Sequence, residues 1–201
     1  MQPKRRMLMF VGFFALSFLA VSSSQAGEWK FPVGLTYIQG FDNVLSVYED
    51  QLGVSTDFSF PFGVDFTPFY QWDHGSRLGM GIGPTALILA STSSNNSSYN
   101  ADYTYFDLPL TFTYGFSFLP KGSVSPYLRL GARYHIVSGD FVDSTSIGGF
   151  GAFGVDFLQK KKVGVEAEVA YDDSTMTMEA VGGIREDVKP GELLISVRVV
   201  F

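Results

Sequence analysis

The last nine residues of the chain alternate between apolar side chains and others at a period of two. One face of the expected strand is wholly apolar and carries Leu193, Ile195, Val197, Val199 and Phe201. Ser196 and Arg198 point to the opposite face, because successive side chains of a strand lie on opposite sides. The pattern predicts a terminal strand with one continuous apolar face that ends on an aromatic side chain.

The first 26 residues read as a secretory signal peptide. Basic residues at positions 4–6 precede an apolar run over residues 7–21, and Ser24-Gln25-Ala26 forms a small-x-small cleavage site. The apolar run is shorter than the ~20 residues that span a bilayer. We therefore expect cleavage after Ala26 and a single mature domain over residues 27–201. The chain has no cysteine, so neither disulfides nor a lipid-modified N-terminus is expected.

The charge of the mature domain is strongly acidic. Residues 27–201 carry 11 basic and 20 acidic side chains, a net charge of −9. Nucleic acid is therefore not an expected partner.

Eight segments of the mature domain alternate in the manner of β-strands, and none shows a helical period. They are residues 29–38, 57–72, 77–90, 102–118, 124–138, 149–158, 163–171 and 191–201. The connections alternate between long and short, as in barrels with short turns at one end and long loops at the other. Pro84 and Pro109 fall inside expected strands, where each removes a ladder donor and predicts a local bulge.

The two faces of these strands differ sharply. One face is crowded with aromatic side chains, which would overfill the interior of an eight-stranded barrel. The other is rich in glycine and carries the charged residues Lys30, Asp65, Arg77, Asp107, Arg129, Arg133, Asp156, Glu166, Glu168 and Arg198. The aromatic face should therefore meet lipid and the charged face should line the lumen. The predicted fold is all-β: an eight-stranded antiparallel transmembrane up-and-down β-barrel.

Aromatic residues gather at the short-turn ends of the strands. This expected girdle consists of Trp29, Phe31, Tyr70, Trp72, Phe116, Phe118, Phe157 and Phe201. Amphipathic rings are favoured at the membrane interface, so the girdle supports a membrane barrel.

The export signal, the eight alternating strands, the long loops at one end and the terminal Phe201 resemble the small outer-membrane barrels of the OmpA/OmpX/OmpW type. The resemblance covers the whole mature chain. It implies an integral protein of the outer membrane in a Gram-negative cell envelope, in contact with lipid and lipopolysaccharide. It also implies that Ile195, Val197, Val199 and Phe201 form the signal read by the barrel-assembly machinery. It does not specify an activity, because such barrels carry many functions.

The candidate chemistry of the chain is sparse. His135, Ser138 and Asp140 invite a Ser-His-Asp interpretation, but positions 135 and 138 point to opposite faces of a strand. His74 falls in a turn, where we expect it to be solvated. No motif indicates a cofactor or a metal site, and we do not expect an enzyme.

The lumen charges are formally balanced, five against five, which suits an ion-paired plug. An eight-stranded barrel has little room for an aqueous channel. Arg129 and Arg133 lie two strands away from Glu166 and Glu168, so contact would need long side chains that reach across the lumen.

The long loops are predominantly acidic, while the short turns carry lysines. The loop carboxylates are Asp42, Glu49, Asp50, Asp57, Asp140, Asp143, Asp172, Asp173, Glu179, Glu186 and Asp187. Simple solvation accounts for most charged surfaces. The sharper hypothesis is that divalent cations bind at these outer loops and bridge them to lipopolysaccharide phosphates.

The sequence therefore predicts a non-enzymatic barrel with a plugged, charged lumen and a structural or surface-interaction role. Three alternatives stay open: a narrow channel for small solutes or ions, an enzyme that modifies lipid A or phospholipid, and a soluble periplasmic barrel that binds an apolar ligand.

Overall fold

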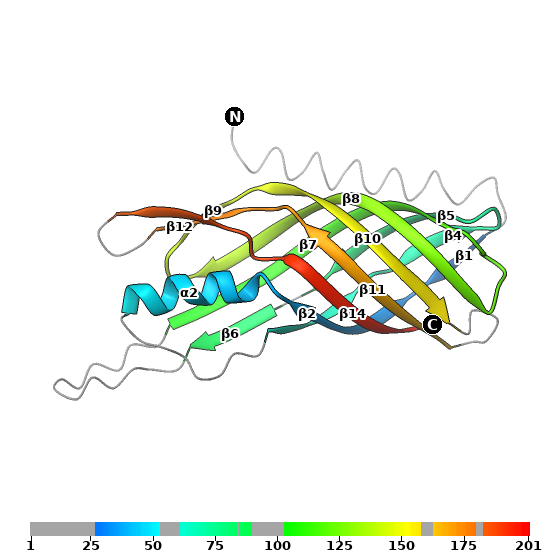
Figure 1. The fold of residues 1–201 in the computed structure, drawn as a ribbon, viewed down its shortest axis with the longest axis horizontal. Coiled ribbons are helices and arrows are strands. Elements are labelled where there is room, and N and C mark those ends of the chain that lie inside the picture. Colours follow the sequence, from blue (N-terminus) through cyan, green and yellow to red (C-terminus); the bar gives the residue numbers. More distant parts are fainter. Residues whose placement is uncertain (1–26, 53–60, 84, 90–102, 158–162, 180–182) are drawn as a thin grey trace.

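The computed structural model describes residues 27–52, 61–83, 85–89, 103–157, 163–179 and 183–201. Its main feature is a closed barrel of eight antiparallel strands (Figure 1). Five strands are continuous: β7 (Tyr103–Ser117), β8 (Val124–Gly139), β10 (Ile147–Phe157), β11 (Gly164–Asp172) and β14 (Glu192–Val200). Three are split into two segments each: β1 (Gly27–Lys30) with β2 (Pro32–Ile38), β3 (Phe62–Phe66) with β4 (Phe69–Trp72), and β5 (Ser76–Ile82) with β6 (Thr85–Leu89).

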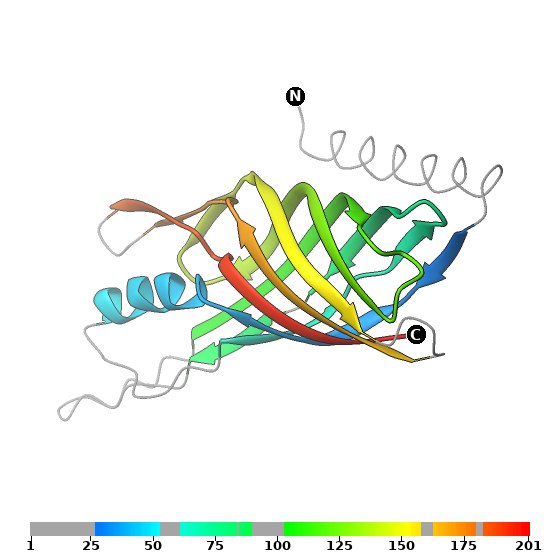
Figure 2. The same ribbon diagram turned by 45° about the vertical axis from the view of Figure 1, so that its right-hand side comes forward.

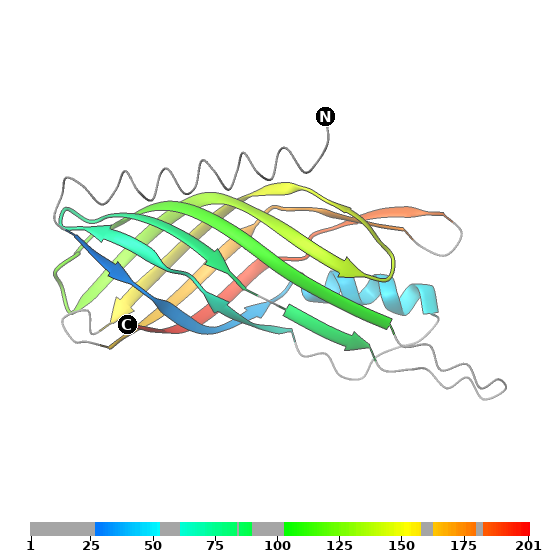
Figure 3. The same cartoon turned by 180° about the vertical axis from the view of Figure 1, so that it is seen from behind.

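Two pairings close the ring. The first strand meets the last where β2 pairs with β14, from Leu194 opposite Ile38 to Val200 opposite Pro32. β5 pairs with β7 on the other side (Figures 2 and 3). These pairings close the sheet into a ring, so the predicted fold class is confirmed. A closed barrel is expected in a membrane, because every backbone polar group must find a partner within the protein.

Prolines account for part of the strand breaks. Pro32 and Pro68 have no N–H to donate to a neighbouring strand. Their carbonyl oxygens still accept hydrogen bonds of 3.0 Å from the backbone N–H groups of Thr67 and Met80, respectively, so the neighbouring strands keep their register. At Pro109 the expected bulge is absent from the β7–β8 pairing, which runs in one uninterrupted register from Tyr105 to Ser117. Pro84 lies outside the described residues.

The barrel is inverted relative to a soluble one. On β14, Ile195, Val197 and Val199 are 45%, 58% and 41% exposed, whereas Ser196 and Arg198 are each 2% exposed. The same alternation runs along the other strands, so apolar side chains cover the outside and polar side chains fill the inside. The inversion predicted from the crowded aromatic face is confirmed.

The loop end departs from the prediction because its first long connection contains a helix, α2 (Phe41–Leu52). Phe41, Val44, Leu45 and Tyr48 recur at helical spacing and form one buried stripe. A separate three-stranded sheet lies beside the helix, with the order β13 (Arg185–Val188), β12 (Met176–Glu179), β9 (Val142–Thr145). The expectation that no segment would be helical is wrong.

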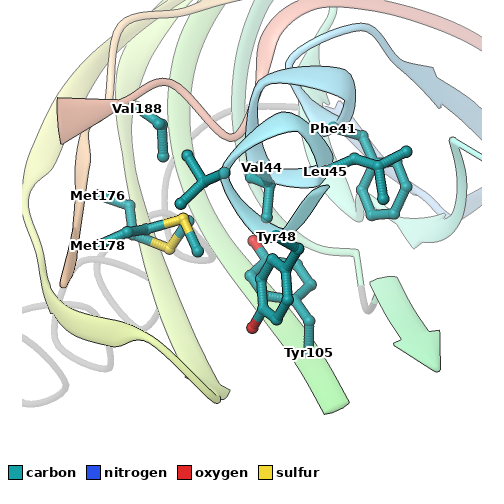
Figure 4. Close-up of a cluster of buried hydrophobic side chains, with 9 residues drawn as sticks. Phe41, Val44, Leu45, Tyr48, Tyr105, Met176, Met178 and Val188 are labelled. Atoms are coloured by element: carbon teal, nitrogen blue, oxygen red, sulfur yellow. The ribbon is translucent and has the colours of Figure 1, made fainter. Parts of the chain in front are cut away.

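Helix, sheet and barrel meet in one apolar cluster (Figure 4). Its buried members are Phe41, Val44, Leu45, Val47, Tyr48, Tyr105, Met176, Met178 and Val188. Tyr105 belongs to β7 and faces inward, so the cluster covers the loop end of the lumen on that side. Within the described ranges, no helix has the length and hydropathy needed to cross a membrane.

Candidate functional site: the charged barrel interior

The candidate site is the inward face of the barrel. Lys30 lies near the short-turn end, where its ammonium is 2.8 Å from a carboxylate oxygen of Glu28. The other nine charged residues predicted for the lumen are buried or half-buried on inward-facing strand positions: Asp65, Arg77, Asp107, Arg129, Arg133, Asp156, Glu166, Glu168 and Arg198.

Arg198 forms the centre of the interior network. Its Nη1 donates to Glu166 Oε1 at 2.6 Å, and its Nη2 lies 2.6 Å from Asp65 Oδ2 and 3.0 Å from Glu168 Oε1. Thr36 donates to Asp65 Oδ2 at 2.9 Å and lies 2.7 Å from the Ser196 hydroxyl. One guanidinium therefore joins carboxylates from β3 and β11, on either side of the closing seam.

Arg129 reaches Glu168 over an intervening strand. Arg129 lies on β8 and Glu168 on β11, with β10 between them, yet Arg129 Nε donates to Glu168 Oε2 at 2.5 Å. The Tyr127 hydroxyl donates to the same oxygen at 2.9 Å, and its ring lies over Gly154, where a Cβ would clash with it. The absence of a side chain at Gly154 leaves room for the Tyr127 ring. Tyr127 and Arg129 both extend past β10 to reach Glu168, which is the reach that the sequence required for contact.

Arg77 forms the layer nearest the short turns. Its guanidinium contacts Asp156 and the Ser117 hydroxyl, and its Nη1 lies 3.9 Å from Glu166 Oε2. The same group sits 4.5 Å from the ring centre of Phe69 and 4.3 Å from that of Tyr127. Charge pairing and cation–π contact together hold this buried cation.

His135 and Asp172 form the layer nearest the loops, and the sequence-based set missed both. His135 Nδ1 is 2.7 Å from Asp107 Oδ2, and its Nε2 is 2.8 Å from Asp172 Oδ2. Carboxylates accept hydrogen bonds, so both contacts are hydrogen bonds only when both ring nitrogens carry protons. Arg133 Nη1 lies 3.4 Å from the same Asp172 oxygen, and Arg133 Nε donates to Thr111 at 2.7 Å. The prediction that Asp172 belongs to an acidic outer loop is wrong, since it is fully buried at the end of β11.

The described interior set is nearly balanced in charge. Four arginines face six carboxylates, and a doubly protonated His135 leaves one excess negative charge. Buried charges are tolerated only when they are paired in this way.

The described residues around His135 are not arranged for acyl transfer. Ser138 is exposed and Asp140 lies in the following turn, so the structure does not bring either to the ring. Ser174 is close by, but its hydroxyl donates to Asp172 Oδ1 at 2.6 Å rather than to the histidine. Both imidazole nitrogens are occupied by carboxylates, which leaves neither free to activate a hydroxyl.

A family model, the outer membrane protein beta-barrel domain, matches residues 11–201. The chain belongs to this family. It is accordingly an outer-membrane barrel, which excludes the soluble periplasmic alternative. No curated protein matches its sequence.

Several solved outer-membrane proteins resemble this barrel in structure. Neisserial surface protein A is 12% identical, with 88% of this chain and 96% of that one covered and a TM-score of 0.46. Ail of Yersinia pestis is 13% identical, with 88% and 100% covered and a TM-score of 0.48. Outer Membrane Protein W of E. coli is 19% identical, with 88% and 98% covered and a TM-score of 0.48.

The predicted aromatic girdle and assembly residues lie mostly on the outside of this outer-membrane barrel. Trp29, Phe31, Phe116, Phe118, Phe157 and Phe201 are exposed, as are Ile195, Val197 and Val199. Tyr70 differs because it is buried, with its ring 5.4 Å from Trp29 and 5.2 Å from the half-buried Trp72. Phe31 and the terminal Phe201 exchange backbone hydrogen bonds and extend the closing seam by one pair.

Some of the loop carboxylates are paired with the few nearby cations. Arg185 lies 3.6 Å from Asp143 and 3.3 Å from Glu179, and Lys189 lies 2.6 Å from Asp173. Hydrogen bonds to Asp173 and Tyr171 raise the pKa of Lys189 above its usual value. Among the described residues, no group of three or more acidic, histidine or cysteine side chains is arranged to hold a metal ion. Asp57 lies outside the described residues.

Proposed function

We propose that this outer-membrane barrel is a non-enzymatic protein with a closed interior, whose loop end serves a structural or surface-interaction role. The observation that carries the proposal is the position of Arg198, which bridges Asp65, Glu166 and Glu168. A guanidinium held by three carboxylates occupies the space that a solute would need.

The helix at the loop end supports the same conclusion. Val44 and Tyr48 of α2 pack with Tyr105, which faces the lumen, so apolar side chains lie above the charged layers. The Asn43 side chain holds the helix in place by donating to Lys189 O at 3.3 Å and to Glu192 Oε2 at 3.0 Å.

Export and assembly complete the proposal. Residues 1–26 act as a cleaved signal peptide, and the outward face of β14 with Phe201 is read by the assembly machinery. The apolar outer face contacts lipid and lipopolysaccharide. The expected signal peptide lies outside the described residues.

The acidic loop end is the surface that would meet partners. Asp42, Asp50, Glu186 and Asp187 are exposed, and divalent cations could bridge such carboxylates to lipopolysaccharide phosphates. Thermal unfolding with and without calcium at fixed ionic strength tests this bridging. A rise in the unfolding midpoint supports it, and an unchanged midpoint removes cations from the proposal.

The narrow channel is the alternative that most needs a test. Purified protein inserted into planar bilayers should give no stepwise current, with insertion verified by flotation and by the different gel mobility of unboiled protein. Reproducible current steps from protein verified in this way would favour the channel instead. Mass spectrometry of lipid A and phospholipid from expressing cells tests the enzyme alternative, and we expect no new species.

A further inference from the structure

His135 lies beneath the point where the three-stranded loop sheet joins the barrel. It is one of only two histidines in the chain, and it is 2% exposed on the inward face of β8. Thr145, the last residue of β9, donates from its hydroxyl to His135 O at 2.8 Å. Asp172, whose Oδ2 is 2.8 Å from His135 Nε2, is the last residue of β11, directly before the connection to β12. One buried residue therefore contacts the roots of two segments that carry the sheet.

Asp172 contacts both ends of the β12–β13 hairpin where they meet the barrel. Its Oδ1 accepts from Ser174 N at 3.0 Å and from Ser174 Oγ at 2.6 Å, which holds the outgoing connection. The returning connection lies against the same side chain, since a Cβ at Gly191 would collide with Asp172 Oδ2. The position of the hairpin therefore depends on where the Asp172 carboxylate is held.

The His135 ring joins this carboxylate to the barrel wall. His135 Nδ1 is 2.7 Å from Asp107 Oδ2 of β7, so the ring bridges Asp107 and Asp172. An ionised carboxylate can only accept, so the complete bridge requires a proton on both ring nitrogens. A neutral imidazole has one proton, and whichever nitrogen retains it, the other turns a lone pair toward a carboxylate. Loss of one proton therefore breaks the bridge between β7 and β11.

The neighbouring inward positions on four strands carry the other charged and titratable groups at this level. They are Tyr105 and Asp107 on β7, Arg133 on β8, Asp172 on β11 and its register partner Glu192 on β14. Arg133 Nη1 lies 3.4 Å from Asp172 Oδ2, so Asp172 keeps one cation when the ring is neutral. Among the described residues, Asp107 forms no other ion pair, and its Oδ1 is buried without a hydrogen-bond partner. A neutral ring therefore leaves the buried Asp107 charge uncompensated, which is unfavourable.

We propose that His135 is a proton-controlled latch for the loop sheet. With both nitrogens protonated, the ring ties β7 to β11 and fixes the root of the β12–β13 hairpin. As the pH rises and one proton is lost, the tie breaks, and the hairpin separates more readily from α2, where Met176 and Met178 are packed. The latch rests on the proposed surface-interaction role for its use, because the external pH would then control how the loop sheet is presented.

Two measurements on the full chain in detergent micelles test whether the ring controls the sheet. Nitrogen NMR of histidine-labelled protein reports whether both ring nitrogens carry protons. A spin label attached through Glu186→Cys, at an exposed position of β13 in a chain without cysteine, reports the mobility of the sheet. Both are followed upward from about pH 6, close to the ordinary pKa of a histidine. We expect the label to become mobile over the pH interval in which His135 loses a proton, with about a tenfold rise in the released population, the size of one hydrogen bond to a charged group.

The two histidines provide matched variants for the same measurement. His135→Gln has no charge to lose, so its label should show the same mobility at every pH. His74→Gln makes the same change at an exposed short-turn position and should respond like the wild type.

Three results would overturn the latch. They are a His135 ring with a single proton while the sheet is immobile, a label whose mobility does not change as the ring titrates, and a pH response that persists in folded His135→Gln. None of these readouts involves a partner or a current. Failure of the latch therefore leaves the closed, surface-interacting barrel in place, and a conducting barrel would not alter the result for the latch.

Discussion

Arg198 and Asp65 form an ion pair across the seam where the barrel closes, with Nη2 and Oδ2 2.6 Å apart. Gly34 of β2 lies between them and is the register partner of both. A Cβ at Gly34 would collide with the Val197 carbonyl of β14. Closure of the ring and the interior ion pairs therefore both depend on the absence of a side chain at Gly34.

Gly34→Ala should weaken closure, because its Cβ meets backbone that cannot move aside. We expect a loss of about 1–3 kcal/mol in unfolding free energy, the range of core overpacking. The temperature at which unboiled protein loses its folded gel mobility measures it. Gly149→Ala is the control, since nothing lies within 4 Å of a Cβ there; equal effects at both glycines would contradict the seam argument.

Arg198→Ala should destabilise the barrel strongly, because it removes the cation that three buried carboxylates share. Breaking a buried pair typically costs about 3–5 kcal/mol. Glu166→Ala and Arg133→Ala should lower the unfolding temperature as well. An unchanged unfolding temperature in both variants would contradict the claim that the interior ion pairs stabilise the barrel. Arg185→Ala removes an arginine that is exposed on β13 and should cost less than about 1 kcal/mol.

Val44→Asp should release α2 while the barrel stays intact. Val44 is fully buried in the loop-end cluster, and an unpaired carboxylate there is strongly unfavourable. Limited proteolysis should cut the variant near residues 41–52, while the gel mobility of the unboiled barrel is retained. Ser46→Asp, at an exposed position on the same helix, should stay resistant; equal cleavage of both would mean that the cluster does not hold the helix.

Tyr48 should make the stability of this cluster sensitive to alkali. Burial, followed by the charge of Asp140, raises the pKa of Tyr48 above its ordinary value of about 10. The folded state then retains a proton that the unfolded state loses, so stability is full below about pH 10 and falls as the pH rises beyond it. Unfolding midpoints between pH 8 and 11.5 should fall less in Tyr48→Phe than in wild type. Parallel curves would show that Tyr48 does not contribute.

The barrel was predictable because side chains alternate between the two faces of a strand, so the sequence alone assigns a face to each residue. Arg198 and Val197 could be placed inside and outside from β14 alone. The same phase places His135 with Arg133, and Asp172 with Glu168. The sequence phase thus already puts His135 on the inward face, although the predicted set of lumen charges leaves it out, whereas Asp172 falls in a predicted loop.

The loop end was harder to predict because its signals are short. Phe41, Val44, Leu45 and Tyr48 do follow helical spacing, but the intervening acidic residues led us to expect a loop. The pairing of β9 with β12 joins segments more than 30 residues apart, and no local pattern specifies such partners. The burial of Tyr70 likewise depends on Trp29, a neighbour from another strand.

The accessibility of Ser196 tests the closed interior most directly. The chain contains no cysteine, so Ser196→Cys gives a single thiol beside Arg198, and Ser146→Cys gives an exposed control on the loop side. The rate of reaction with a charged methanethiosulfonate is measured on folded protein and again after boiling. We predict that the thiol at position 196 reacts only after unfolding, while the thiol at 146 reacts at once; comparable rates in the folded barrel would contradict a closed lumen.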